Sequence, residues 1–456
     1  MTRTTRSPGS ARDVLRLAVP ALPVLAAEPL YLLVDTAVVG RLGALPLASL
    51  AVAAVLFAQV TTQLTFLSYG TTARASRFYG AGRRSAAVTE GVQATWLAVA
   101  VGLLVIGLGQ LFAAPVAGVL AGGGAIADGA VSWLRIALLG APMVLVTLAG
   151  NGWMRGVQDT KRPMYYVLAG NGLSALMCPF LVHGVGDWDG WGLEGSAVAN
   201  VVAQTVSAAL FLRALAVERR RAPASDPVRL RPDATVLRAQ VTMGRDLVIR
   251  SLGFQACFLS ATAVASRFGA ESVAAHQIVL QLWVFQSLVL DAVAIAAQAL
   301  VGSALGAAAS AGSQGTAHAR AVAARVTWYG LVLGCVFAVV FAALYPVLPG
   351  VFTADAGVLA TIPAAWWFFT ALQPIAGVVF ALDGVLLGAG DAAFLRTATL
   401  LAALGGFLPL IWLSLVFGWG LAGIWTGLTA FMVLRLAGVG WRTYSGRWAV
   451  PGEVRS

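Results

Sequence analysis

Charged residues are scarce in this chain of 456 residues: Asp, Glu, Lys and Arg make up only 11% of it. A soluble domain ordinarily carries about 25% of these residues, so the chain lacks the polar side chains needed to cover a water-exposed surface. Hydrophobic residues, by contrast, make up 59% of the sequence. The composition therefore excludes an ordinary soluble enzyme and a disordered protein, and it indicates an integral membrane protein.

Cysteine and histidine are also scarce, with three of each. Cys178, Cys257 and Cys335 lie inside apolar runs at unrelated spacings, so they predict neither a disulfide framework nor a metal motif. Three scattered histidines are too few for a metal cluster. A membrane-embedded enzyme would need His, Asp or Cys gathered at one interface, and the sequence has no such group. We therefore expect no metal, no cofactor and no enzymatic activity.

Acidic residues are outnumbered, because 19 Asp and Glu stand against 30 Lys and Arg, which gives a formal net charge of +11. The basic residues occupy short breaks between apolar runs, so they do not predict a nucleic-acid partner. At the N-terminus no short apolar stretch with a small-residue cleavage site follows the first four arginines. We expect a retained cytoplasmic tail there, not a signal peptide, and this tail holds Arg3, Arg6, Arg12 and Arg16.

Apolar runs of about 20 residues predict membrane-spanning helices. Twelve runs qualify, near residues 14–39, 46–73, 86–110, 131–154, 163–185, 191–217, 240–265, 272–303, 318–345, 358–387, 393–417 and 420–440. With the N-terminus in the cytoplasm, most of the Arg and Lys fall on the cytoplasmic side, as the positive-inside rule requires. The outer loops hold acidic residues instead. We therefore expect twelve spans in the plasma membrane, with both termini in the cytoplasm.

The second half of the chain repeats the first. DTAVVGRLGA at 35–44 matches ATAVASRFGA at 261–270, and NGWMRGVQD at 151–159 matches DGVLLGAGD at 383–391. Because each half has six spans, both halves have the same orientation, related by a pseudo-two-fold axis along the membrane normal.

The repeat predicts an all-α membrane protein of two six-helix lobes. Its expected parts are an N-lobe at 1–218, a cytoplasmic linker at 219–236 and a C-lobe at 237–456. Two lobes around a central cleft are typical of a transporter that works by alternating access. Because one chain supplies both lobes, we expect a monomer.

Asp35 is an ionisable residue inside the first predicted span. Such residues are costly in the membrane and predict function, and apolar surroundings disfavour the charged carboxylate, which suits it to taking and releasing a proton. Glu28 precedes it by seven residues, which puts both on one helix face about 10 Å apart. Pro20, Pro23 and Pro29 predict a kink beside them. Alternatively, Asp35 balances Arg41 at the interface and Glu28 faces a wet cavity.

Further polar residues stand in both halves. Asn151, Asn171, Ser174 and Asn200 lie on first-half spans, where they complete a network with Asp35 or serve as interhelical hydrogen-bonding residues. The second half offers Arg250, His276, Gln277, Asp291, Gln298 and Asp383. Asp291 and Asp383 either pair with Arg250 as a structural ion pair or line a cleft for a cationic substrate. The glycines spaced four apart, Gly152 with Gly156 and Gly384 with Gly388, permit close helix packing.

These motifs together resemble the MATE family, the multidrug and toxic compound extrusion transporters, and within it the DinF-type branch. The resemblance covers nearly the whole chain. It is carried by PLYLLVDTAVVGRLG at 29–43, AAHQI at 274–278, LDAVAIAAQALVG at 290–302, LDGVLLGAGD at 382–391, and the GWGLEG and GWGLAG motifs at 190–195 and 418–423.

The resemblance implies export of organic, often cationic, compounds in exchange for H⁺ or Na⁺, with Asp35 as the coupling carboxylate. It also implies that the first helix bends when this residue is protonated. Many bacterial members carry Asn and Asp in the fifth span where this chain has Ser174 and Cys178, and a sixth-span Thr corresponds to Asn200. The second carboxylate of that lobe is therefore missing, and Glu28 is the candidate to replace it.

We therefore predict an efflux antiporter for small organic molecules, embedded in the lipid bilayer and driven by H⁺. Na⁺ remains a possible coupling ion, although a hard cation prefers several oxygen ligands. The main alternative is a lipid or glycolipid flippase of a related two-lobe family. That function requires cations along the cleft, and the sequence offers mainly Arg250.

Overall fold

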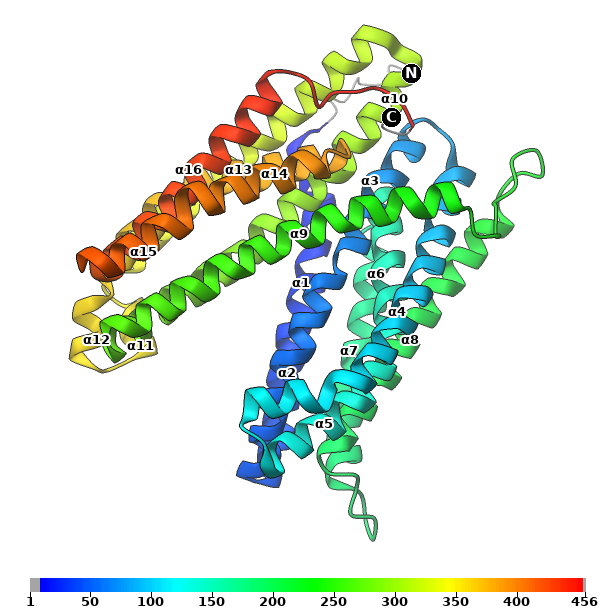
Figure 1. The fold of residues 1–456 in the computed structure, drawn as a ribbon. Helices are drawn as coiled ribbons and strands as arrows, with labels where there is room; N and C mark the ends of the chain where they lie inside the picture. Colours follow the sequence, from blue (N-terminus) through cyan, green and yellow to red (C-terminus); the bar gives the residue numbers. More distant parts are fainter. Residues whose placement is uncertain (1–8, 454–456) are drawn as a thin grey trace. The chain divides into compact units, whose positions relative to one another are not determined.

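The computed structural model describes residues 9–453, without the side chains of residues 310–313. Within that range the regular elements are helices joined by short connections, and the one β-type pairing is an isolated bridge between Val185 and Trp188 (Figure 1). The predicted tail residues Arg3 and Arg6, and Arg455 at the other end, lie outside the described residues.

The described chain forms two compact units, the N-terminal unit of Val19–Gly244 and the C-terminal unit of residues 9–18 with 245–453. It passes from one unit to the other inside two helices, α1 (Ala11–Val39) and α9 (Ala234–Ala265). The predicted division into 1–218, 219–236 and 237–456 stays a prediction.

The N-terminal unit holds most of α1 and the helices up to the start of α9. These helices are η1 (Gly40–Leu42), α2 (Ala44–Leu64), α3 (Phe66–Gly80), α4 (Arg84–Ala121), α5 (Gly124–Leu139), α6 (Ala141–Gly156), α7 (Lys161–His183) and α8 (Leu193–Arg220).

The C-terminal unit holds most of α9 and the helices that follow it. These helices are η2 (Ser266–Phe268), α10 (Ala270–Leu344), α11 (Leu348–Phe352), α12 (Ala356–Thr361), α13 (Pro363–Gly388), α14 (Ala392–Ala402), η3 (Ala403–Phe407), α15 (Leu408–Phe417) and α16 (Gly420–Tyr444).

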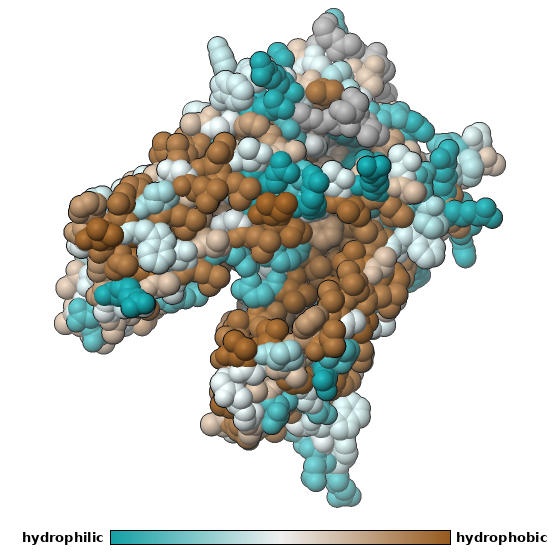
Figure 2. All heavy atoms as spheres, viewed as in Figure 1, coloured by the Kyte–Doolittle hydropathy of each residue, from teal (hydrophilic) through white to brown (hydrophobic). Residues whose placement is uncertain are grey.

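The helices of the described part are suited to a membrane. Eleven helical segments are long and apolar enough to cross it, and α5 with α6, bent by 48° at their junction, makes a twelfth if the pair counts as one span. Each of these twelve segments overlaps one of the predicted apolar runs. Hydrophobic residues also cover most of the visible sides of the helices (Figure 2). The predicted all-helical membrane fold is therefore confirmed.

Breaks within the spans are features that the apolar runs did not reveal. The second span is divided at Thr65 into α2 and α3. Conversely, α10 continues for 75 residues through two spans. A Cβ on Gly315 would lie 2.5 Å from the Cα of Ala308, whereas a straight helix separates residues seven apart by about 10 Å. The chain therefore reverses direction within α10 near residues 308–315.

The repeat seen in the sequence is also present in the local structure. A short 3₁₀ turn follows both α1 and α9, and each turn ends at a glycine that precedes the next helix. Gly43 has φ 119° and Gly269 has φ 98°, a region almost closed to other residues. The two matching motifs thus form the same helix–turn–helix connection.

Helix packing repeats as well. A Cβ on Gly152 would collide with the backbone of Ser68, and one on Gly156 would collide with Ala75 and press on the carbonyl oxygen of Thr72. A Cβ on Gly384 or Gly388 would collide with the backbone of Ala294 or Gln298. The partners of the second pair lie 226 residues after those of the first. In the first half, the Thr72 hydroxyl also donates to the Gly152 carbonyl at 2.9 Å. These glycines therefore pack helices closely, as predicted.

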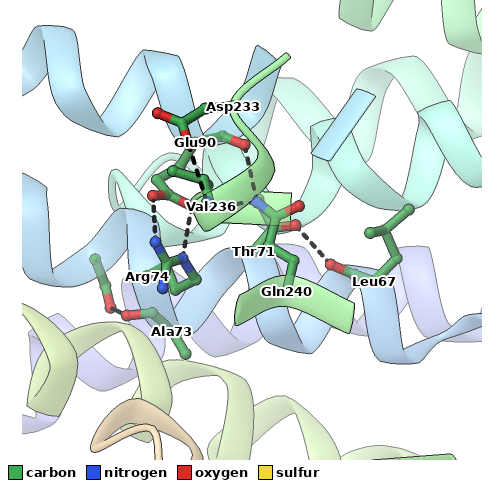
Figure 3. Close-up of polar contacts among 9 residues, drawn as sticks. Leu67, Thr71, Ala73, Arg74, Glu90, Asp233, Val236 and Gln240 are labelled. Carbon is green, nitrogen blue, oxygen red and sulfur yellow. Dashed lines mark hydrogen bonds and ion pairs between the residues drawn. The ribbon is translucent and has the colours of Figure 1, made fainter. Parts of the chain in front are cut away.

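The segment between α8 and α9 is bound to the N-terminal unit through α4. Gln93 donates to the carbonyl of Arg231 and accepts from the amide of Asp233, both at 2.8 Å. Trp96 donates to the carbonyl of Leu230 at 2.8 Å. Further along, Gln240 of α9 donates to the Glu90 carboxylate at 3.1 Å (Figure 3). The connection is therefore a docked part of this unit.

Candidate functional site

Asp35 of α1 lies in the interior of the N-terminal unit, where its exposed fraction is 0%. The thiol of Cys178 on α7 donates to its Oδ1 at 3.3 Å. Its Oδ2 has no hydrogen-bond partner among the described residues. Ser196 of α8 also lies close enough to interact with this carboxyl group, and its hydroxyl accepts from the Trp133 indole at 2.7 Å.

Tyr31 lies one helical turn before Asp35 and is surrounded in a similar way. Its hydroxyl is near Ser174 of α7 and Asn200 of α8. Within the described part of the chain, the hydroxyls of Tyr31 and Ser174 have no hydrogen-bond partner.

Three helices thus contribute side chains to two successive layers, because α1, α7 and α8 each supply a pair of residues four apart. One layer is formed by Asp35, Cys178 and Ser196, and the other by Tyr31, Ser174 and Asn200.

A cavity of about 150 Å³ lies beside the Tyr31 layer, within the same unit. Glu28 is its only charged lining residue among those described, and Tyr31 lines it as well. The other polar side chains of the lining are hydroxyl and amide groups: Thr61, Thr65, Thr147, Asn151, Asn171, Asn200, Gln204 and Ser207. The cavity therefore presents a carboxylate and many neutral polar groups.

The first-half residues predicted from the sequence lie around this cavity. Glu28, Asn151, Asn171 and Asn200 line it, and Ser174 lies next to Tyr31. None of the four predicted network residues forms a hydrogen bond with Asp35 that the described structure records, and Asn171 donates to the carbonyl of Val167 instead.

Three residues that were not predicted as site residues complete the arrangement, and one of them, Cys178, stands at the position of the missing fifth-span carboxylate. Cys178 supplies the hydrogen bond to Asp35, and Ser196 and Tyr31 flank it. Their spacing of four from Ser174, Asn200 and Asp35 was the signal that pointed to them.

In the C-terminal unit, Asp383 of α13 pairs with two arginines. Arg250 of α9 donates to its Oδ2 at 2.5 Å, and Arg435 of α16 donates to the same oxygen. Both guanidinium groups lie over the ring of Phe254, at 5.5 and 4.9 Å from its centre. Asp383 was predicted either to pair with Arg250 or to line a cleft for a cationic substrate, and the structure shows the ion pair. Arg435 was not among the predicted second-half residues, and it is buried inside α16.

The remaining second-half candidates are dispersed. His276 is buried near Trp425, with 6.0 Å between ring centres, and neither ring nitrogen has a partner among the described residues. Gln277 is exposed, Asp291 is partly buried, and Gln298 packs against Gly388. The described residues contain no group of three or more His, Cys, Asp and Glu placed to hold a metal ion.

Comparison with known proteins identifies the family. The MatE family model matches residues 20–180 and 247–413, which cover both halves of the repeat. The chain belongs to this family. The predicted resemblance is therefore confirmed, and the chain is a membrane transporter for small molecules, of the multidrug and toxic compound extrusion type, and not an enzyme.

Relatives cover nearly the full length of the chain. Protein DETOXIFICATION 44, chloroplastic, of Arabidopsis thaliana is 33% identical over 96% of this chain and 83% of its own length. The DNA damage-inducible protein F of Escherichia coli (strain K12) is 28% identical over 96% and 94%. A crystal structure described as MATE in the bent conformation has a TM-score of 0.86 at 19% identity, covering 96% of both chains, and it shares the fold.

Proposed function

We propose that this MATE transporter is a plasma-membrane antiporter that exports organic, often cationic, compounds in exchange for protons. Both termini lie in the cytoplasm in this proposal. The observation that carries it is the environment of Asp35, a fully buried carboxyl group with a single thiol donor and one unpartnered oxygen. Burying a charge with so little compensation is costly, and protonation removes that charge.

Proton coupling is favoured over Na⁺ coupling by the ligands available to Asp35. A hard cation needs several oxygen ligands, whereas the hydrogen-bond donor to this carboxyl is a soft thiol and one hydroxyl, that of Ser196, lies close by. A proton needs only the carboxyl oxygen itself.

The cavity supports a cationic substrate. Glu28 is the acidic residue of its lining, and no basic residue is among its described lining. A flippase for phosphate-bearing lipids would require the opposite charge, so this cavity does not favour it.

The proposed cycle links the two groups through Tyr31, which lines the cavity and lies one turn from Asp35. Protonated Asp35 favours the state that releases substrate, and deprotonated Asp35 favours the state that binds it. Exchange requires that the proton and the substrate have different affinities for the two states. In this proposal the proton passes between the cavity and Asp35 by way of Tyr31.

Transport in proteoliposomes with an imposed pH gradient tests this function. Wild type should move a fluorescent organic cation, and Asp35→Asn should lose gradient-driven movement. Asp187→Asn is the matched control, because Asp187 is an exposed carboxylate in the same unit, and it should transport normally. Equal transport by Asp35→Asn and wild type would remove Asp35 from the mechanism. Transport driven by a Na⁺ gradient at equal pH would replace the proton with Na⁺.

A further inference from the structure

A groove of about 500 Å³ runs along the C-terminal unit between the second half of α10, α13 and α16. Its α10 wall is a stripe from Arg320 to Leu331 at spacings of three and four residues, which is one face of a helix. Small side chains at Ala323 and Ala324, with Gly440 opposite, leave the space open.

One end of the groove carries a positive charge. Arg320 is exposed, and its guanidinium lies across Gly446, where any Cβ would collide with it. Gly446 also has φ 68°, which favours glycine at this position. Within residues 9–453 the structure records no ion pair for Arg320, and no acidic residue lines the groove. The guanidinium is therefore available to an anion.

The rest of the groove is apolar. Thr327 and Thr443 line it, but their hydroxyls donate to carbonyls of their own helices at 2.8 and 2.7 Å. Trp328 contributes a large ring that is 60% exposed. The stripe from Arg320 to Leu331 covers eleven helical steps, or about 16 Å.

We propose that this groove binds an anionic phospholipid, with its phosphate on Arg320 and one acyl chain along the apolar stripe. The groove has one cation at the end of an apolar trough of about 16 Å. This arrangement fits an amphiphilic molecule with a charged head group and an apolar chain. Arginine is well suited to phosphate, and basic pockets between membrane helices bind anionic head groups. A free phosphate would use only the arginine and leave the trough empty.

Aromatic residues at the charged end fit the same occupant. Tyr444 is 95% exposed at the end of α16 and lines the groove, where the buried Trp448 forms part of the wall. Tyr and Trp concentrate where a membrane meets water, which is the depth of a lipid phosphate. In the orientation proposed above, this end faces the cytoplasmic leaflet, where anionic lipids are attracted to basic residues. The lipid site itself does not depend on the transported compound or the coupling ion.

Native mass spectrometry of the delipidated full chain in detergent tests the proposal. Wild type should retain phosphatidylglycerol about fivefold more tightly than phosphatidylcholine, the factor expected for one basic residue. Arg320→Gln should abolish this preference. Ala324→Phe should weaken binding of both lipids, because Ala324 is an exposed residue of the trough. Arg267→Gln removes an exposed arginine elsewhere in the same unit and should bind as wild type does.

Three outcomes would overturn the proposal. In the first, neither Arg320→Gln nor Ala324→Phe changes lipid retention. In the second, only Arg320→Gln loses the anionic lipid and inorganic phosphate competes for it, which would mean a simple anion site. In the third, wild type forms a lipid-independent dimer that Ala324→Phe disrupts, which would place a second copy on the groove. Both changes are at exposed positions, and elution as a single monodisperse peak checks that the variants fold.

Discussion

Replacing Glu90 with alanine should destabilise the N-terminal unit strongly. Arg74 donates to both carboxylate oxygens of Glu90 at 2.7 Å, from Nε and from Nη2. Gln240 donates to the same carboxylate at 3.1 Å, and these contacts join α3, α4 and the start of α9 (Figure 3). The Glu90 side chain is 3% exposed and that of Arg74 is 15% exposed, so water cannot readily replace the lost contacts.

The magnitude follows from the charge that remains. Removing one partner of a buried ion pair costs about 3–5 kcal/mol, because the other charge stays buried without compensation. In a folded unit of this size each kcal/mol lowers Tm by about 2–4 °C. Glu90→Ala should therefore lower Tm by at least about 6 °C, measured from the folded fraction that survives heating in detergent.

Glu218→Ala is the matched control. Glu218 pairs with Arg162 and Arg221 at 3.4 and 3.1 Å, but these arginines are 47% and 68% exposed. An exposed pair contributes about 0–1 kcal/mol, so Tm should barely change. Equal shifts for Glu90→Ala and Glu218→Ala would refute the reasoning. The Arg74→Ala and Glu90→Ala double variant should lose less stability than the two single variants added together.

Three further predictions concern other contacts. Cys178→Ala removes the thiol donor to Asp35. Because a neutral hydrogen bond contributes about 1 kcal/mol, the initial rate of pH-driven transport should change by less than about tenfold. Complete loss of transport would give Cys178 a larger role. Asp383→Asn leaves the buried Arg435 and the partly buried Arg250 without a counter-charge, whereas Arg250→Gln leaves Asp383 paired with Arg435. Asp383→Asn should therefore have the lower Tm, and the reverse order would contradict the ion-pair assignment. Gly152→Val should abolish the monodisperse peak in size-exclusion chromatography, because even a Cβ at this position collides with the backbone of α3. Gly172→Ala has nothing within 4 Å of its Cβ and should behave as wild type. A normal peak from Gly152→Val would show that α3 and α6 can separate.

Much of the fold could be predicted because it depends on local composition. Apolar runs indicate span length directly, and the repeated motifs predicted two related halves. The glycine spacing predicted the close packing at Gly152 and Gly384. The turns at Gly43 and Gly269 came only from the structure. The division of the second span at Thr65 and the bend between α5 and α6 were missed. Hydropathy measures how apolar a segment is, and it does not report where its axis changes direction.

The site was predictable where a single residue is energetically unfavourable in a membrane span. Asp35 and Glu28 stand out because a carboxyl group in a span is rare, and the structure places one in a buried layer and the other in the cavity lining. Cys178 is an ordinary apolar residue in sequence, and only the proximity of α7 to α1 makes it a donor. Arg435 was not predicted as a site residue, because a basic residue towards the end of a span is typical of a topology signal. Its ion-pair partner, Asp383, lies 52 residues away in the sequence.

The position of the unit boundaries has a consequence for any attempt to divide the protein. Residues 9–18 belong to the C-terminal unit and residues up to Gly244 to the N-terminal unit. A chain cut between α8 and α9 would therefore produce two fragments that each begin with a helical segment required by the other. Separate expression should yield incomplete halves, and only co-expression of both fragments can restore a complete set of helices to each unit.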